Sequence, residues 1–150
     1  MMSRINQQRA SEKTDYDLRL TKDLDVVKIQ DLTEAVSWGR RGDDKWRETL
    51  SKSAVVCSLW HGDRLVGFGR VVEDGVMCML YDIAVHPELQ NQGLGSRIMQ
   101  ALIDRVKDRN YVSIGLFAWD KNPANIPFYE KFEFVPSHGM ELTKYMRTEG

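Results

Sequence analysis

The stretch from 86 to 106, HPELQNQGLGSRIMQALIDRV, places two glycines and three side-chain amides directly before an amphipathic helical pattern. The first-turn N–H groups of a helix have no intrahelical partners and carry the positive end of the helix dipole. Gly93 and Gly95 let those amides approach a ligand closely, so the loop favours a phosphate group. The alternative, a glycine-assisted turn before an ordinary helix, leaves the side-chain amides at 90–92 unexplained.

Two well-known phosphate loops do not match this stretch. A nucleotide P-loop requires Gly-Lys-Ser/Thr, and the dinucleotide fingerprint requires three glycines with an acidic residue at a second strand end. If the loop binds phosphate, it belongs to another kind of site.

Local patterns predict the elements that position this loop. Apolar residues recur at spacings of three and four in 25–38, which is typical of a helix, and Gly62-Asp63 and Asp74-Gly75 punctuate three β-rich runs, which predicts a meander of hairpins. The expected elements are a strand at 16–20, helices at 25–38 and 44–50, three strands between 54 and 85, a helix from 94 to about 110, a strand at 111–118, a helix at 125–132 and a strand at 140–146. This order indicates the α+β class with a mixed sheet.

Length and composition limit the kind of protein. The chain has 150 residues with 21 Lys+Arg against 22 Asp+Glu, a net charge of −1. This balance gives no electrostatic reason to expect nucleic acid or a membrane as a partner, and no apolar run is long enough to span a bilayer. We expect a disordered polar tail at 1–14 and a single domain at 15–150. Cys57 and Cys78 lack metal-ligand spacing and indicate a reducing compartment, with the cytoplasm as the default.

Two motifs in this order resemble those of the GNAT N-acetyltransferases. Residues 83–95, IAVHPELQNQGLG, are similar to the family's Gln/Arg-x-x-Gly-x-Gly/Ala motif, and 122–134, NPANIPFYEKFEF, to its Asn followed by a short helix with an aromatic-Tyr pair. The resemblance covers roughly 18–146. It implies a mixed, mostly antiparallel sheet that splays at its central parallel strand pair and is flanked by about four helices. It also implies transfer of the acetyl group of acetyl-CoA to a primary amine.

The resemblance assigns the loop to the pyrophosphate of acetyl-CoA and the splayed strands to its pantetheine arm. Within it, the N–H of Val85 is the candidate for polarising the thioester carbonyl in an oxyanion-hole role. The chemistry needs no metal, and none is expected. The residues expected to bind the cosubstrate are Ile83, Ala84, Val85, Gln90, Asn91, Gln92, Gly93, Leu94, Gly95, Ser96, Asn122, Phe128 and Tyr129.

The reaction also needs groups that move protons. A primary amine with a pKa near ~10.4 must lose a proton before it attacks, and the departing CoA thiolate benefits from a proton donor. Tyr129 matches the family's general acid, although a tyrosine that only fills the core is the alternative. Family members that use a carboxylate or histidine on the central strand as base place it where Met79 or Tyr81 stands here. Asp82 is the nearest carboxylate, but strand alternation predicts that it faces away from Tyr81. Asp82 as base, Asp82 as a structural polar residue, a water chain, and an amine that binds already neutral all stay open.

The acceptor is expected near residues 37–44, after the first helical pattern. Ser37, Trp38 and Arg40 are the candidate substrate residues. An aromatic ring with acidic neighbours suits a small amine, whereas the arginines suit an anionic group on the acceptor. The alternative is a solvated loop that binds no substrate.

The expected mechanism is direct attack of the amine in a ternary complex. The rival functions are a non-catalytic acetyl-CoA sensor or regulatory module, and a site for another phosphate ligand. Edge-strand dimers are common in the family, so a homodimer stays open beside a monomer.

Overall fold

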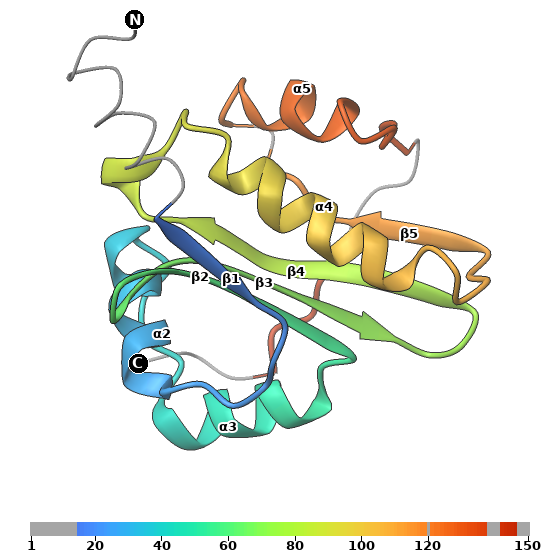
Figure 1. Cartoon of the computed structure of the whole chain (residues 1–150). Coiled ribbons are helices and arrows are strands. Elements are labelled where there is room, and N and C mark those ends of the chain that lie inside the picture. Colours follow the sequence, from blue (N-terminus) through green and yellow to red (C-terminus); the bar gives the residue numbers. More distant parts are fainter. Residues whose placement is uncertain (1–14, 120, 138–141, 147–150) are drawn as a thin grey trace, which may run out of the picture. The chain divides into compact units, whose positions relative to one another are not determined.

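The computed structural model describes residues 15–119, 121–137 and 142–146, which form two compact units, one up to Phe117 and one from Ala118 on. The first unit holds a five-stranded sheet, three α-helices and a 3-10 turn, and the second holds one short helix (Figure 1). The elements are β1 (Tyr16–Arg19), α2 (Val26–Ala35), α3 (Asp43–Lys52), β2 (Val55–His61), β3 (Arg64–Glu73), β4 (Met77–Val85), η1 (Pro87–Leu89), α4 (Leu94–Val106), β5 (Ser113–Leu116) and α5 (Asn125–Glu130).

The strands of the sheet follow the order β1-β2-β3-β4-β5, so each strand lies beside its neighbour in sequence. The first three pairings are antiparallel, and β4–β5 is parallel, with α4 as the crossover between its strands. Gly62 and Gly75 both adopt positive φ angles in the tight turns before β3 and β4, a conformation in which glycine pays no Cβ penalty. The predicted meander and mixed sheet are therefore confirmed.

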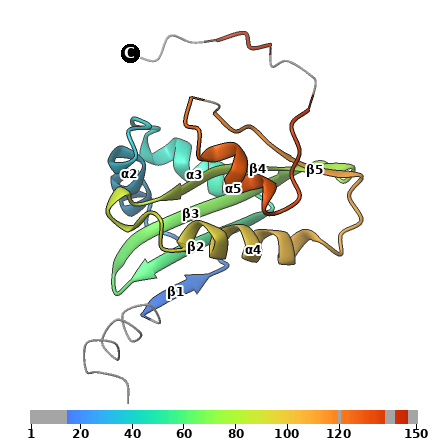
Figure 2. The ribbon, with the colours of Figure 1, turned by 90° about the horizontal axis from the view of Figure 1, so that it is seen from above.

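Helix α4 covers one face of the sheet and runs along β2 and β3, as the view from above shows (Figure 2). Its apolar stripe, which includes Ile98 and Leu102, is completely buried. Two glycines in β3 allow this close approach. A Cβ on Gly67 would lie 2.7 Å from Ile98, and one on Gly69 would lie 2.9 Å from Ile98 and 3.0 Å from Leu102. The glycines at positions 67 and 69 therefore determine how closely α4 can pack against β3.

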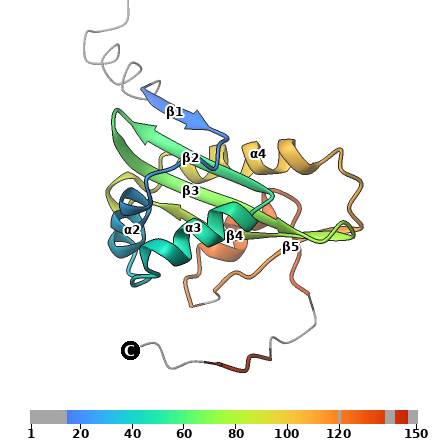
Figure 3. The same cartoon turned by 90° about the horizontal axis from the view of Figure 1, so that it is seen from below.

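Helices α2 and α3 lie on the opposite face of the sheet, which Figure 3 shows from below. Trp46 of α3 packs edge-on against Phe68 of β3, with ring centroids 5.7 Å apart. Both rings are almost fully buried, in a cluster that also contains Ile29 and Leu32 of α2. Burial of these large side chains, each worth about 1.5–3 kcal/mol, holds the two helices to the sheet.

Several sequence-based boundaries differ from the structure. Helix α2 ends at Ala35 rather than near Trp38, and α3 runs from Asp43 to Lys52, with Gly42 as its N-cap, rather than over 44–50. The last expected strand is absent from its described part, 142–146, and its first two residues lie outside the described residues, as does the expected tail at 1–14. None of the helices in the described ranges is long and apolar enough to cross a membrane.

Candidate active site

The loop before α4 has the geometry that anion binding requires. Gly93, the N-cap residue, adopts φ +80° and carries no side chain that could cap the helix, and the preceding Asn91 adopts φ +65°. The first turn of α4 contains no acidic residue, and the first intrahelical bond runs from Arg97 N to Gly93 O. The amides of 94–96 therefore point out of the helix end without a capping group, so a phosphate fits where a carboxylate cap would otherwise sit.

Beside this loop, β4 extends beyond its pairing with β5. The ladder runs only from Met77 to Leu80 on β4 and takes up all of β5, whereas β4 itself continues to Val85. Beyond Leu80, no strand within the described ranges pairs with that edge of β4. The parallel pair is thus confirmed, and the end of β4 has an edge without a strand partner, which is what an extended ligand requires.

The register of β4 on β3 shows which way the backbone of Val85 points. His86 N donates to Val66 O at 2.8 Å, which makes the adjacent pair, Gly67 and Val85, one of the non-hydrogen-bonded type. The N–H and C=O of Val85 therefore point away from β3, toward the open side, where Gln90 Nε2 donates to Val85 O at 3.2 Å. This direction is the one that an oxyanion-hole donor at Val85 needs.

A β-bulge interrupts β4 just before these residues. The pairing with β3 shifts by one residue between Phe68 and Arg70, so that Asp82 and Ile83 together face Gly69. Asp82 adopts φ +56°, in the left-handed region that Asp and Asn tolerate better than most residues. A Cβ on Gly69 would lie 2.8 Å from Ile83, so the glycine opposite the bulge also makes room for it.

The bulge overturns the expected orientation of Asp82. Arg70 Nε donates to Asp82 Oδ2 at 2.6 Å, and the guanidinium of Arg70 also lies 5.2 Å from the ring centroid of Tyr81. Asp82 and Tyr81 therefore lie on the same face of the sheet, the face of α2 and α3, rather than on opposite faces. Regular alternation fails here because the extra residue resets the period of two.

Asp82 is held by two arginines from different elements. Arg41, in the loop between α2 and α3, donates from Nη1 to Oδ2 at 3.0 Å and from Nη2 to Oδ1 at 3.2 Å, in addition to the bond from Arg70. Burial alone would raise the pKa of Asp82, but the hydrogen bonds and charges of the two arginines outweigh it and hold the pKa below its usual value. The carboxylate is therefore ionised at neutral pH.

The expected acceptor residues lie in the α2–α3 loop, residues 36–42. Ser37 adopts φ +65° just after α2, and the Trp38 side chain is half exposed. Arg40 forms an exposed ion pair with Glu34 at 2.9 Å, whereas its neighbour Arg41 reaches β4. The loop thus brings Arg41, rather than Arg40, to β4.

The three remaining candidates belong to the second unit. Asn122 Oδ1 accepts a hydrogen bond from Ala124 N at 3.0 Å in the turn before α5. Phe128 and Tyr129 are half-buried neighbours on α5 whose ring centroids lie 5.0 Å apart, and Tyr129 also contacts the ring of Phe134. Burial raises the pKa of the Tyr129 hydroxyl, so it carries its proton at neutral pH.

Sequence reasoning missed Arg70 and gave Arg41 no role of its own. The signal for Arg70 is a charged residue in the apolar run VGFGRVV, on the same face as Phe68 two residues earlier. A largely buried arginine requires a carboxylate partner, and Asp82 is the carboxylate that the neighbouring strand supplies. Nothing in the sequence indicates that Arg41 bonds the same carboxylate, because 41 residues separate them.

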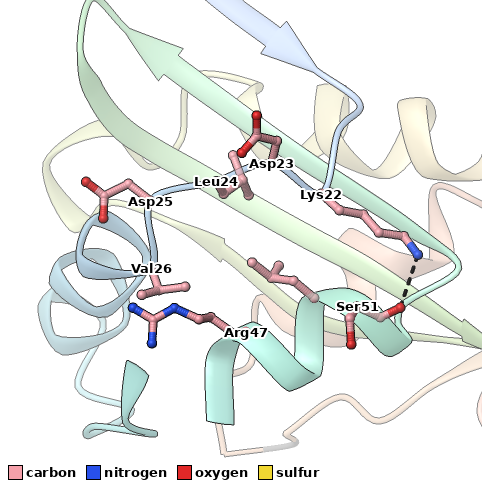
Figure 4. Close-up of a pocket in the computed structure, with 8 residues that line it drawn as sticks. Lys22, Asp23, Leu24, Asp25, Val26, Arg47 and Ser51 are labelled. Atoms are coloured by element: carbon pink, nitrogen blue, oxygen red, sulfur yellow. Dashed lines mark hydrogen bonds between the residues drawn. The ribbon is translucent and has the colours of Figure 1, made fainter. Parts of the chain in front are cut away.

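A hollow of about 650 Å³ lies elsewhere in the first unit, between the start of α2 and the side of α3 (Figure 4). It is lined by residues 22–26 and by side chains of α3, and Lys22 Nζ donates to Ser51 O at 3.3 Å across it. None of the expected site residues lines it, so it is not part of the candidate active site. The described residues also contain no group of three His, Cys, Asp or Glu that could hold a metal ion.

The mixed sheet with its parallel β4–β5 pair and the crossover helix α4 is the fold expected from the sequence motifs, and comparison with known proteins agrees. The chain matches the Acetyltransferase (GNAT) family over residues 24–134. It therefore belongs to the GNAT family, and it is an acetyl-CoA-dependent N-acetyltransferase.

Individual relatives support this assignment. The chain is 33% identical over 129 residues to the uncharacterized N-acetyltransferase ycf52 of Porphyra purpurea, covering 83% of this chain and 72% of that protein. It is 30% identical to serotonin N-acetyltransferase 2, chloroplastic, of rice, covering 78% of this chain and 60% of that protein. Among solved structures, a probable acetyltransferase of Staphylococcus aureus superposes with a TM-score of 0.74 at 28% identity, covering 86% of this chain and all of that one.

Proposed function

We propose that this protein transfers the acetyl group of acetyl-CoA to a primary amine by direct attack within a ternary complex. The observation that carries the proposal is the edge of β4 beyond its pairing with β5, which holds the Val85 backbone beside the uncapped N-terminus of α4. This edge and the helix end suit the two parts of one ligand, an extended amide-containing arm and a pyrophosphate.

The backbone of this chain supplies binding and polarisation. Amides of 92–96 hold the pyrophosphate, with Gln90 and Asn91 beside them, and Ile83 and Ala84 flank the pantetheine arm. The Val85 N–H donates to the thioester oxygen, which stabilises the negative charge that develops when the amine nitrogen bonds the carbonyl carbon. Hydrogen-bond donors of this kind are worth about 3–4 kcal/mol in acyl transfer.

Tyr129 is the proposed general acid. As the C–S bond breaks, its hydroxyl gives a proton to the CoA sulfur, and the raised pKa keeps that proton available at neutral pH. Asn122 and Phe128 are proposed to contact the cofactor arm. The amine reaches the site neutral or loses its first proton to water. The nitrogen gives up a second proton to solvent as the tetrahedral intermediate collapses to the amide, and Tyr129 regains its proton from solvent. The role of Asp82 is taken up below.

The acceptor is proposed to be a small amine bound near Ser37, Trp38 and Arg40. For the compartment, we propose the cytoplasm or another reducing one, because Cys57 and Cys78 are buried and unpaired.

CoA thiol release from acetyl-CoA by the purified protein tests the proposal. The panel of amines should contain a polyamine, an arylalkylamine, an amino sugar, an aminoglycoside, an amino acid and a peptide N-terminus, with an amine-free control. Release with one class above the control supports the transferase and names the acceptor class. Acetyl-CoA binding without release for any amine contradicts the proposed transfer to these acceptors, and preference for ADP over CoA in competition contradicts acyl-CoA binding.

A further inference from the structure

We infer that Asp82 is a positioning residue rather than the general base: with Arg41 and Arg70, it clamps the α2–α3 loop to the bulge of β4. The inference concerns the same site as the proposed function and rests on it for the statement that this loop lies on the acceptor side. The clamp itself rests on geometry alone.

The clamp joins elements that are distant in sequence. Arg41 comes from the loop, Arg70 from β3 and Asp82 from β4, and both carboxylate oxygens accept from guanidinium groups. Each arginine is held on its other side as well. The guanidinium carbon of Arg41 lies 4.1 Å from the ring centroid of buried Trp46, and Arg70 Nη1 lies 3.5 Å from Ser53 Oγ. Planar guanidinium groups that are both bonded and stacked have little freedom to move.

The loop needs such an attachment because its own backbone is permissive. Gly39 and Gly42 adopt φ +76° and +88°, with no atom within 4 Å of the position that a Cβ would take. Its C-terminal end has a second anchor, because Gln30 Oε1 accepts from Gly42 N at 3.3 Å. Between α2 and this anchor, the pair between Arg41 and Asp82 is the side-chain bond among the described residues that ties the loop to the sheet.

The same geometry makes Asp82 a poor base. A carboxylate that accepts a proton would have to give up bonds to guanidinium groups that stay charged, and the Arg41, Arg70 and Asp82 side chains together carry one net positive charge. Besides these, Tyr81 is the titratable group that the described contacts place beside the cluster. Of the three clamp side chains, only Arg41 is substantially exposed, at 34%. The part of the clamp that can meet an acceptor is therefore the α2–α3 loop, and the carboxylate of Asp82 is not accessible to it.

Limited trypsin digestion tests the clamp without reference to catalysis. Arg40 and Arg41 offer cleavage sites in the loop, and release of the clamp exposes them. Asp82→Asn removes the ionic partner but keeps a residue that tolerates positive φ, and Arg41→Lys keeps the charge and the trypsin site but not the two-pronged bond. Arg47→Lys is the matched control, because Arg47 forms an exposed pair with Asp44 at 2.8 Å.

We expect cleavage after residue 40 or 41 to be about tenfold faster in Asp82→Asn and Arg41→Lys than in the wild type, and unchanged in Arg47→Lys. Because Arg41→Lys alters a half-exposed side chain, it tests the clamp even if Asp82→Asn does not fold. Wild-type cleavage rates in Arg41→Lys would overturn the clamp, whatever the protein acetylates.

Steady-state kinetics with the amine that the thiol-release assay identifies then distinguishes a positioning role of Asp82 from a role in proton transfer. For a positioning residue, both variants raise the KM for the amine by a similar factor, leave the KM for acetyl-CoA unchanged and keep the acidic limb of the pH–rate profile. The inference would be overturned if Asp82→Asn, but not Arg41→Lys, lowered kcat about 10²-fold or more and removed the acidic limb of the pH–rate profile. That result would identify Asp82 as the base. If no amine is turned over, the proposed function fails, and the digestion still decides the clamp.

Discussion

Replacement of Gly93 by alanine tests whether the start of α4 holds the cosubstrate. A Cβ at this position meets no atom within 4 Å, so the substitution changes only the backbone preference. An L-residue at φ +80° costs about 1–2 kcal/mol relative to glycine, and we expect a loss of about 1 kcal/mol in the free energy of unfolding. In a chain of this size, such a loss lowers Tm by about 2–4 °C.

The effect on binding should be larger than the effect on stability. If residue 93 leaves the left-handed region, the amides of residues 94 and 95 turn away from the pyrophosphate, and one charge-assisted hydrogen bond is worth about 1.5–3 kcal/mol. The Kd for acetyl-CoA should therefore rise about tenfold or more. Calorimetric titration measures this constant, and thermal unfolding of the same samples measures stability.

Gly75→Ala is the matched control. Gly75 adopts φ +92° in the turn before β4, also with no atom near its Cβ position, so it should lose similar stability and keep the Kd of the wild type. An unchanged Kd in Gly93→Ala, with the expected loss of stability, would refute pyrophosphate binding at α4. Equal weakening in both variants would show that the effect is general rather than local.

Three further outcomes are expected. Tyr129→Phe should lower kcat about 10²-fold with an unchanged KM for acetyl-CoA in steady-state assays, and an unchanged kcat would remove Tyr129 from the acid role. Gly69→Ala should lower the free energy of unfolding in urea by about 1–3 kcal/mol, because its Cβ would lie 2.8 Å from Ile83 and 2.9 Å from Ile98; wild-type stability would mean that α4 is free to shift. Because the folded pKa of Asp82 is depressed, its ionised form stabilises the fold above the unfolded pKa of about 3.9, and this contribution is lost as pH falls through the folded pKa. The stability difference between wild type and Asp82→Asn should therefore shrink as the pH falls below about 4, and a difference that stays constant there would contradict the ion pairing.

Local patterns were sufficient for most of the fold. Gly62 and Gly75 mark the two hairpin turns because a tight turn demands a conformation that few other residues adopt, and that demand is visible in four residues of sequence. The helical spacing from Leu94 onward likewise predicted α4, since its buried stripe repeats every turn. The loop before α4, with positive φ angles at Asn91 and Gly93, was predictable for the same reason, because its glycine and amide residues are contiguous in sequence.

The geometry around Asp82 was not predictable in this way. Alternation along β4 assumes one residue opposite one residue, and whether β4 or β3 carries an extra residue depends on the pairing of two strands. An aspartate that tolerates positive φ and a glycine at 69 on the partner strand are compatible with a bulge but do not require one. The contact from Arg41 depends on the path of a whole loop, which residue types alone do not encode.

The two buried cysteines have a practical consequence for the assay itself. Cys57 and Cys78 have no measurable exposure, and burial raises the pKa of the Cys57 thiol to about 12 and also raises that of Cys78. Because the thiolate is the reactive form, neither side chain should react with a disulfide reagent while the sheet is closed. The folded enzyme should therefore not react with the colorimetric disulfide reagent that measures the released CoA thiol. A slow thiol signal from the enzyme without substrate would measure the rate at which the sheet unfolds, so one assay reports both turnover and unfolding.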